Sequence, residues 1–389
     1  MARERTTTSC LLLGSLAVWA CSLSVFTAPI DAQATAPSVQ SFPSDPIWTV
    51  DVKAIPVGSP LASRDYVFVP VQGAISALRL SDGSEAWTAK VELAGIPAAS
   101  GDYLIVPTKE SLQVLRADTG EVVWSDRTPA VTAAPLVAGD HLIVSTGETV
   151  TSYALADGAK RWTREIGPID QRSAAADDRL YVPITDGRLA ALDLATGEPV
   201  WEADPGINPT EPLVHGNRIY VGTAAKRFVC LLRATGREDW APRVAATVIG
   251  RAATDGVRVY FTALDNMLYA LDAQTGNRRW TKNLTYRPSA GPTLVGTTIA
   301  VPGRFTRMMS FNAANGSAAN PLALTEPLVY VPAFIDPTEK SPTRLAALFG
   351  NLENVWKLLL AGPPPPPLPK LPVAPVTVLP GTPVSRPGR

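Results

Sequence analysis

Three aspartates are the first residues in this 389-residue chain whose type and recurrence could do chemistry. Asp118, Asp193 and Asp272 each stand shortly before a Thr-Gly pair. Carboxylates act as general bases or metal ligands when other polar groups converge on them. A short pattern that recurs far along the chain instead favours a structural role, in which the aspartate accepts hydrogen bonds from its own turn. We therefore expect these aspartates to close turns.

The other groups that catalysis would need are scarce. The chain has two histidines, His141 and His215, both beside expected turns, where we predict exposure to solvent. It has no Gly-x-Ser-x-Gly elbow, no glycine-rich phosphate loop and no Cys-x-x-Cys-His haem motif. If Cys10 and Cys21 are removed or acylated, Cys230 is a lone thiol that cannot form an internal disulfide. The sequence therefore predicts no catalytic residue, no metal site and no cofactor.

The elements that carry these residues follow a repeat marked by tryptophan. Eight of the nine tryptophans lie 37 to 40 residues apart, except for one interval of 76 residues in which Asn320 takes the place of the expected tryptophan. A fixed period near 40 residues indicates a repeat architecture. The eight are Trp48, Trp87, Trp124, Trp162, Trp201, Trp240, Trp280 and Trp356.

Residues 173–201 show what one repeat contains. Four short segments, the first made of small residues and the last ending near Trp201, are separated by turn pairs that include Asp186-Gly187 and Thr196-Gly197. Glycine reaches the positive φ that tight hairpins need. Four antiparallel strands per repeat are typical of a propeller blade, with the small residues at the crowded inner edge. We predict an all-β, eight-bladed β-propeller over residues 46–361, with seven blades and a C-terminal extension as the alternative.

The segment around Trp48 looks like a ninth strand of the outer type. In a ring, such a strand can complete the last blade beside residues 353–360 and remove a free sheet edge.

The recurring motif, as in Asp272-Ala-Gln-Thr-Gly-Asn-Arg-Arg-Trp280, resembles the pyrroloquinoline-quinone-type propeller repeat family over residues 46–361. The resemblance implies that each indole stacks over the Thr-Gly peptide of an adjacent blade. Asn320 and the segment Phe349-Gly-Asn-Leu-Glu, in place of a Thr-Gly turn, depart from the pattern. The motif residues are Trp87, Trp124, Trp162, Trp201, Trp240 and Trp280, with Asp118, Asp193 and Asp272.

Quinoprotein dehydrogenases share this repeat but add adjacent cysteines, a calcium site and a catalytic aspartate. The chain has no Cys-Cys pair, and it is more similar to the BamB-like outer-membrane assembly propellers. That resemblance implies a monomeric, non-catalytic scaffold whose partners are envelope proteins, among them a β-barrel insertase. A quinone-dependent alcohol or sugar dehydrogenase and a glycan- or peptide-sensing propeller remain alternatives.

The two ends of the chain predict export. Arg3 and Arg5, an apolar run and Ala32-Gln-Ala34 are typical of a secretory signal peptide over residues 1–34, followed by a linker over 35–45. Lipidation at Cys21 is the alternative to cleavage after Ala34. Residues 362–389 are proline-rich and predict a disordered tail. Lys plus Arg equal Asp plus Glu at 35 each, which disfavours nucleic acid as a partner. We expect the periplasm, or the periplasmic face of the outer membrane.

A candidate binding site follows from the register of the repeats. When the fourth, fifth and sixth repeats are aligned on their Tyr-Val pairs and on the Tyr-Phe of the sixth, Arg172, Glu211 and Arg251 occupy one equivalent position. That position begins the innermost strand, so the three side chains should lie side by side on the rim of the central opening. Charged concave rims bind partners, and arginine is enriched in interface hot spots. A solvated ion-pair bridge of little energy is the alternative.

Overall fold

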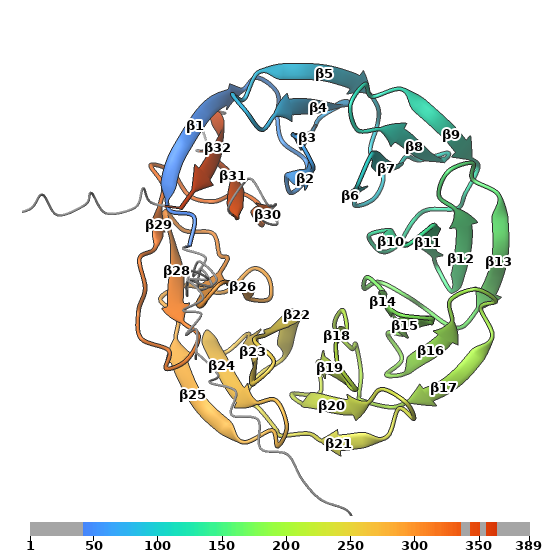
Figure 1. Ribbon diagram of the computed structural model, residues 1–389, viewed down its shortest axis with the longest axis vertical. Helices are drawn as coiled ribbons and strands as arrows, with labels where there is room; N and C mark the ends of the chain where they lie inside the picture. The colour runs from blue at the N-terminus through green and yellow to red at the C-terminus, as the bar shows by residue number, and fades with distance from the viewer. Residues whose placement is uncertain (1–41, 336–342, 351–354, 364–389) are drawn as a thin grey trace, which may run out of the picture. The chain divides into compact units, whose positions relative to one another are not determined.

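Eight antiparallel sheets of four strands each stand around one axis, with the innermost strand of each sheet facing that axis (Figure 1). The computed structural model describes residues 42–335, 343–350 and 355–363, and all of them belong to the unit formed by residues 39–389. The prediction of an eight-bladed β-propeller is confirmed, and the alternative of seven blades with an extension is wrong.

In blades 1 to 7 the chain runs outward from the axis, so strands that follow each other in sequence also pair in the sheet. Blades 1 to 3 are β2 (Leu61–Ser63), β3 (Tyr66–Val71), β4 (Ala74–Arg79) and β5 (Glu85–Lys90); β6 (Ala98–Ser100), β7 (Tyr103–Pro107), β8 (Leu112–Arg116) and β9 (Val122–Asp126); and β10 (Leu136–Ala138), β11 (His141–Thr146), β12 (Thr149–Ala154) and β13 (Lys160–Glu165). Blades 4 and 5 are β14 (Ala174–Ala176), β15 (Arg179–Pro183), β16 (Leu189–Asp193) and β17 (Pro199–Ala203); and β18 (Leu213–His215), β19 (Arg218–Gly222), β20 (Phe228–Leu232) and β21 (Glu238–Trp240). Blades 6 and 7 are β22 (Val248–Thr254), β23 (Arg258–Ala263), β24 (Met267–Asp272) and β25 (Arg278–Asn283); and β26 (Thr293–Val295), β27 (Thr298–Val301), β28 (Arg307–Asn312) and β29 (Leu322–Ala323).

Blade 8 is assembled from both ends of the described chain. Its strands are β30 (Ala333–Ile335), β31 (Arg344–Gly350), β32 (Trp356–Gly362) and, outermost, β1 (Asp45–Val52). The prediction that the Trp48 strand completes the last blade is confirmed, because β1 pairs antiparallel with β32 from Asp45 opposite Gly362 to Val52 opposite Trp356.

The hydrophobic core lies in the layers between blades. In β15 the fully buried Leu180 and Val182 pack towards blade 3, whereas Tyr181, whose side chain points the other way, packs towards blade 5. Successive residues of a strand point to opposite faces. A strand whose two faces both pack against neighbouring blades is therefore apolar at successive positions, as the run Leu-Tyr-Val in β15 shows.

The outer strands are held by tryptophan side chains that lie over a glycine of the next blade. A Cβ on Gly197, whose φ is +72°, would stand 2.6 Å from the ring of Trp162. The Trp162 indole also donates a 3.0 Å hydrogen bond to the Leu194 carbonyl. The expected stacking over a Thr-Gly peptide is confirmed at four pairs: Trp87 and Gly120, Trp162 and Gly197, Trp201 and Gly236, and Trp240 and Gly276. Trp124 and Trp280 lie in the same way over Gly158 and Gly316, which follow Asp157 and Asn315 and not a threonine.

The aspartates of the motif behave as predicted at two of the three positions. The Asp193 carboxylate accepts hydrogen bonds of 3.0 Å from both the backbone and the hydroxyl of Thr196. Asp272 makes the same turn and also pairs with Arg279, and these contacts lower its pKa to about 2. Asp118 departs from this turn geometry, because it directly precedes its threonine and its carboxylate accepts mainly from Arg116, at 2.9 and 3.0 Å.

Two assignments in the last repeat need correction. Trp48, on β1, is the outer tryptophan of blade 8, and its indole lies over Gly83 of blade 1 and donates to Leu80 O at 3.1 Å. Trp356 begins the third strand of that blade and is not part of the outer ring. Phe349 and Gly350, which begin the other departing segment, are the last residues of the second strand of blade 8, so they are not the counterpart of a Thr-Gly turn between third and fourth strands.

The described residues supply no outer tryptophan to the junction between blades 7 and 8, which is packed differently. Asn320 occupies the predicted place beside β28, where its carbonyl accepts a 2.7 Å hydrogen bond from Ser310. Phe42 is buried in the cluster between the two blades, with its ring 6.4 Å from that of Phe334. Because Phe42 is buried and β1 begins at Asp45, the last residues of the expected 35–45 linker take part in the propeller.

None of the described residues forms a helix with the length and apolar character to cross a membrane. The expected signal peptide, Cys21, Ala34 and residues 364–389 of the expected tail lie outside the described residues.

Truncation after Gly362 is expected to leave the melting temperature of the protein unchanged. The removed segment has no apolar periodicity with which to join the core, and β32 with its partner β1 stays complete. Differential scanning calorimetry measures the effect. A variant that ends at Leu358 is the control, because it loses Leu359 and Leu360 from the core and should melt several degrees lower. A lower melting temperature of the first variant would mean that the tail packs on the propeller.

Candidate functional site: a charged rim on the central opening

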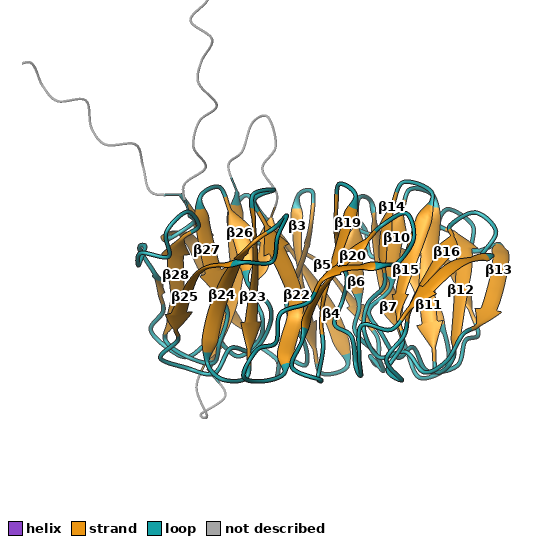
Figure 2. Ribbon diagram, turned by 90° about the horizontal axis from the view of Figure 1, so that it is seen from below, coloured by secondary structure: helices purple, strands orange, loops and turns teal. Residues whose placement is uncertain are grey.

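The loops of the propeller gather on two opposite faces (Figure 2). The connections from one blade to the next and the hairpins between second and third strands lie on one face, which we call the inter-blade face. The hairpins between first and second strands and between third and fourth strands lie on the opposite face. The inner strands of blades 4, 5 and 6 begin at the inter-blade face, so Arg172, Glu211 and Arg251 belong to it.

The structure brings these three predicted side chains together. One oxygen of Glu211 lies 3.8 Å from a terminal nitrogen of Arg172 and 3.7 Å from Nε of Arg251. Both distances fit an ion pair but exceed the usual length of a hydrogen bond. The three residues thus form a charge-charge bridge across three blades, with Glu211 in the middle.

Glu211 is the most enclosed member of the bridge, with 24% of its side chain exposed, against 39% for Arg172 and 51% for Arg251. Burial raises the pKa of Glu211, and the nearby positive charges of Arg172 and Arg251 oppose this shift in part. An acid whose pKa is raised by burial destabilises the fold once it is ionised. The carboxylate therefore gives the fold no evident advantage at neutral pH.

Two buried donors beside the bridge have no hydrogen-bond partner within the described residues. They are Nε of Arg172 and the hydroxyl of Ser173, a residue that is 4% exposed. Buried polar groups in proteins are almost always paired. Ser173 was not a predicted site residue, and only its place next to Arg172 in the sequence could have suggested it.

A bulge in β22 sets the position of Arg251. This inner strand has seven residues, and its register with β23 shifts between Ile249 and Ala253. Gly250 has a φ of +64° and packs closely against the backbone of Gly291. A Cβ on either glycine would overlap the backbone of the segment opposite. Arg251 and Glu211 line a cavity of about 500 Å³ at this place. The Gly-Arg pair in a strand of otherwise small and apolar residues is the sequence signal for the bulge.

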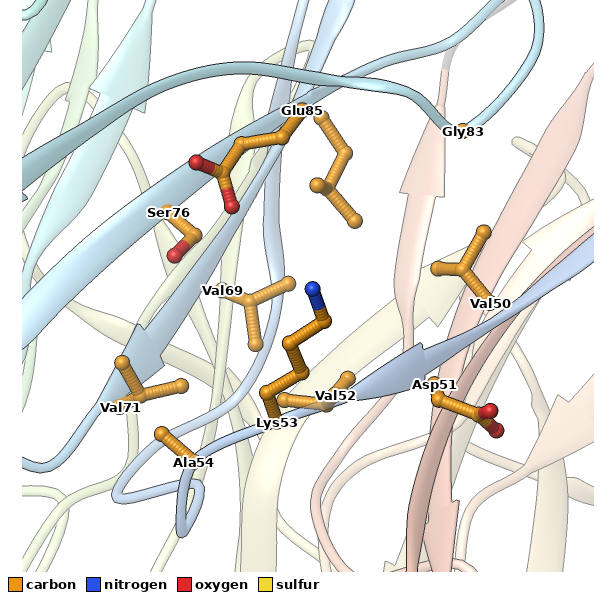
Figure 3. A pocket seen from close by; sticks show the side chains of 11 residues that line it. Val50, Asp51, Val52, Lys53, Ala54, Val69, Val71, Ser76, Gly83 and Glu85 are labelled. Atoms are coloured by element: carbon orange, nitrogen blue, oxygen red, sulfur yellow. The ribbon is translucent and has the colours of Figure 1, made fainter.

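A second cavity, of about 250 Å³, lies where blade 8 meets blade 1 (Figure 3). Val50 and Val52 of β1 and Val69 and Val71 of β3 line it, and the Lys53 side chain extends into it (Figure 3). Its charged side chains are exposed, so water can reach the ammonium group. We interpret this cavity as a water-filled gap at the junction of blades 8 and 1, where the ring of blades closes, and not as a ligand site.

The described residues contain no group of three or more His, Cys, Asp or Glu side chains that could hold a metal ion. Cys230 is buried, and burial raises the pKa of its thiol to about 12, so the reactive thiolate is disfavoured.

His215 is exposed as predicted, but the prediction for His141 is wrong. Its side chain is 11% exposed, and it lies 2.9 Å from the Ser152 hydroxyl and 2.8 Å from Arg161. Ser152 is fully buried, so its hydroxyl is not accessible as a nucleophile.

The protein is a β-propeller of eight four-stranded blades with a charged inner rim. The outer ring of tryptophan side chains packed on glycines identifies its repeats as the pyrroloquinoline-quinone type. A family model described as outer membrane protein assembly factor BamB matches residues 71–210 and 204–331, which is more than half of the chain. The chain therefore belongs to this family.

The similar proteins are named either as outer-membrane assembly factors or as a quinohemoprotein dehydrogenase. The outer membrane protein assembly factor BamB of Burkholderia pseudomallei is 28% identical over 151 residues, which cover 36% of this chain and 39% of that protein. The quinohemoprotein alcohol dehydrogenase of Comamonas testosteroni is 29% identical over 143 residues, which cover 29% of this chain and 19% of the dehydrogenase. The chain thus spans about two fifths or less of these two relatives. The crystal structure of BamB from Moraxella catarrhalis has a TM-score of 0.67 at 22% identity and covers 82% of this chain and 99% of that chain. That likeness concerns the fold.

Proposed function

We propose that this protein is an exported, non-catalytic scaffold of the bacterial envelope, and that it assists the assembly of outer-membrane β-barrel proteins by binding a protein partner such as the barrel insertase. Membership of the BamB family supports this proposal, as do four similar proteins that are named assembly factors. We place the partner site at the rim formed by Arg172, Glu211 and Arg251.

The observation that carries the proposal is that two buried hydrogen-bond donors at the rim have no partner among the described residues. Nε of Arg172 and the Ser173 hydroxyl are buried without a partner among the described residues, and both ion-pair distances to Glu211 are long. A buried donor without a partner costs about 1–3 kcal/mol. A site that keeps two such donors beside a carboxylate whose burial raises its pKa is better suited to receive a polar group of a partner than to stabilise the fold.

Replacing Arg172 and Arg251 together with alanine is expected to abolish capture of the barrel insertase's periplasmic domains by the purified protein. The protein should stay folded, with a melting temperature lowered by a few degrees at most, because both arginines are largely exposed but Glu211 loses the positive charges that oppose the rise of its pKa. Capture on immobilised protein, followed by quantitative mass spectrometry, measures the first quantity, and calorimetry the second. The control replaces Arg64 and Arg116, which form exposed ion pairs with Asp102 and Asp118 on the opposite face. Undiminished capture by the folded Arg172 and Arg251 variant would exclude the rim as the partner site.

Glu211→Gln separates the two interpretations of the bridge. If the bridge stabilises the fold, the variant should melt at a lower temperature. We expect an unchanged or slightly higher melting temperature at pH 7, since the amide removes a buried charge, together with weaker capture of the partner.

A quinone-dependent dehydrogenase is the second candidate, because part of the chain is similar to the Comamonas enzyme. The rim does not suit a bound calcium ion with its quinone, since the carboxylate of Glu211 lies between two guanidinium groups that would repel a cation. Incubation of the purified protein with calcium and pyrroloquinoline quinone tests this candidate directly. Cofactor absorbance that remains after gel filtration, together with reduction of a dye by alcohols or sugars, would establish the enzyme and contradict the scaffold proposal.

We propose the periplasm, or the periplasmic face of the outer membrane, as the location, with the protein as a monomer. Intact mass spectrometry of the mature protein distinguishes a chain that begins after Ala34 from one that carries lipid on Cys21. A glycan- or peptide-sensing propeller would bind its ligand in the cavity beside Arg251. Such a protein would retain that binding without any barrel-assembly partner.

A further inference from the structure

Blade 7 departs from the other blades and carries an exposed basic surface on the inter-blade face. Its outer strand, β29, has two residues, and Asn320 stands where each of the seven other blades supplies a stacking tryptophan. The surface consists of Arg287, Arg304, Phe305 and Arg307, and we call it the blade 7 patch. Arg287 comes from the connection between blades 6 and 7, and the other three come from the β27–β28 hairpin and the start of β28.

The three arginines of the patch are close in the backbone. Pro288 and Gly303 form an isolated antiparallel β-bridge. The residues beside them, Arg287 and Arg304, therefore lie at neighbouring positions of two adjacent segments. Arg307 follows three residues later as the first residue of β28. The side chains are exposed, and the described residues supply no ion pair or side-chain hydrogen bond to any of the three.

The corresponding hairpins of blades 4 and 5 are built differently. Arg188 pairs with Glu202 at 3.2 Å, and Arg227 pairs with Glu238 at 2.7 Å. In both blades a glutamate of the outer strand neutralises the arginine of the hairpin. Blade 7 has no such glutamate on its two-residue outer strand, so its positive charges remain available to another molecule.

Phe305 is held in a fixed place within the patch. It is 45% exposed, and its ring stacks on that of the buried Tyr286 with 5.7 Å between the centroids. The Tyr286 hydroxyl in turn donates to the carbonyl of Val301. An exposed aromatic ring that is oriented by a buried one loses little entropy on binding, and aromatic and arginine side chains dominate the energies of interfaces.

A hollow of about 120 Å³ adjoins the patch. Arg304 and Gly303 line it together with Leu328, Tyr330 and two serines, Ser59 and Ser289. Its surface is mainly apolar, and its volume suits one aliphatic side chain. The patch thus combines an aromatic surface and a small apolar hollow with three positive charges that have no partner in the part of the chain that the structure describes.

We propose that the blade 7 patch binds an extended acidic segment of a partner protein, with carboxylates on Arg287, Arg304 and Arg307 and one aliphatic side chain in the hollow. Guanidinium groups form strong, often bidentate, hydrogen bonds with carboxylates. The hollow requires a ligand that alternates charge with a small apolar group, and an acidic peptide that contains valine does so. This surface uses none of the rim residues and is independent of the rim's function.

The probe is a fluorescein-labelled peptide of about twelve residues in which Asp and Glu alternate with Val, and its binding is followed by fluorescence anisotropy. Replacing Arg287 and Arg304 with alanine should weaken binding at least about tenfold, and salt should weaken binding to the unaltered protein. The matched control replaces Arg237 and Arg278, two other exposed arginines without ion pairs within the described residues, on the opposite face. It should bind as the unaltered protein does.

Phe305→Ala should also weaken binding, whereas Val257→Ala, which removes a 57% exposed side chain from the opposite face, should not. A peptide with Asn and Gln in place of Asp and Glu should not bind. Equal binding by the Arg287 and Arg304 variant would overturn the proposal, and so would an equal loss in the control pair. Loss of binding only in the Arg172 and Arg251 variant would assign the peptide to the rim. Binding of phosphatidylglycerol vesicles without binding of the peptide would replace the acidic segment by a lipid surface.

Discussion

Replacing Trp201 with alanine is expected to lower the free energy of unfolding by about 3–5 kcal/mol. The indole lies over Gly236 of blade 5, donates a 3.0 Å hydrogen bond to the carbonyl of Arg233 and stands 5.9 Å from the Tyr181 ring. Alanine would leave a cavity between blades 4 and 5 and an unpaired carbonyl group. Urea unfolding followed by circular dichroism measures the loss.

Val200→Ala is the matched control for this experiment. Val200 precedes Trp201 on the same strand, points outward and is 43% exposed, so its truncation should change stability by less than about 0.5 kcal/mol. Equal stability of the Trp201 variant and the unaltered protein would contradict the role of the tryptophan ring in holding the blades together.

Deleting residues 42–52 is expected to destabilise the propeller by more than the loss of Trp201. These residues form a single strap that supplies Phe42 to the junction of blades 7 and 8, β1 to the edge of blade 8, and Trp48 to the junction with blade 1. Without the strap, the fully buried Leu358 and Leu360 of β32 would lie at an open sheet edge. Open edges of this kind also promote association between chains.

Adding the strap back as a separate peptide tests this explanation. A synthetic peptide of residues 42–52 should restore the melting temperature of the truncated protein and reverse any association seen by gel filtration. A peptide with Trp48→Ala should restore less, whereas one with Ile47→Ala, whose side chain is 51% exposed, should restore as much as the native peptide. A truncated protein that melts cooperatively at the original temperature would show that blade 8 closes without β1.

The repeat and the clustering of the three charged rim residues could be predicted because they depend on local patterns. The tryptophan period, the Thr-Gly turns and the small inner strands each reflect one blade and its nearest neighbour, and such contacts repeat with the sequence. The register that aligned Arg172, Glu211 and Arg251 also held, since equivalent positions of successive blades lie side by side around an axis.

The errors arose where the chain departs from the period. Trp356 fits the spacing, yet it lies on a third strand, because the outer place in blade 8 is taken by Trp48 from the other end of the chain. His141 looked like a surface residue beside a turn, but Arg161 and Ser152 enclose it. Asp118 has the residue type of the motif at a different distance from its threonine, so its carboxylate pairs with Arg116.

The sequence by itself therefore determined an all-β propeller of eight blades, its tryptophan ring and the placement of three charged residues at one level of the inner edge, because hydrophobic alternation and turn chemistry act over a few residues. Only the tertiary structure decided how the ring closes, that Phe42 fills the junction at Asn320, that Arg172 and Ser173 keep unpaired donors, and that the arginines of blade 7 have no acidic partner among the described residues. These features depend on contacts between segments far apart in the chain and on the absence of a neighbouring side chain, and no local pattern encodes either.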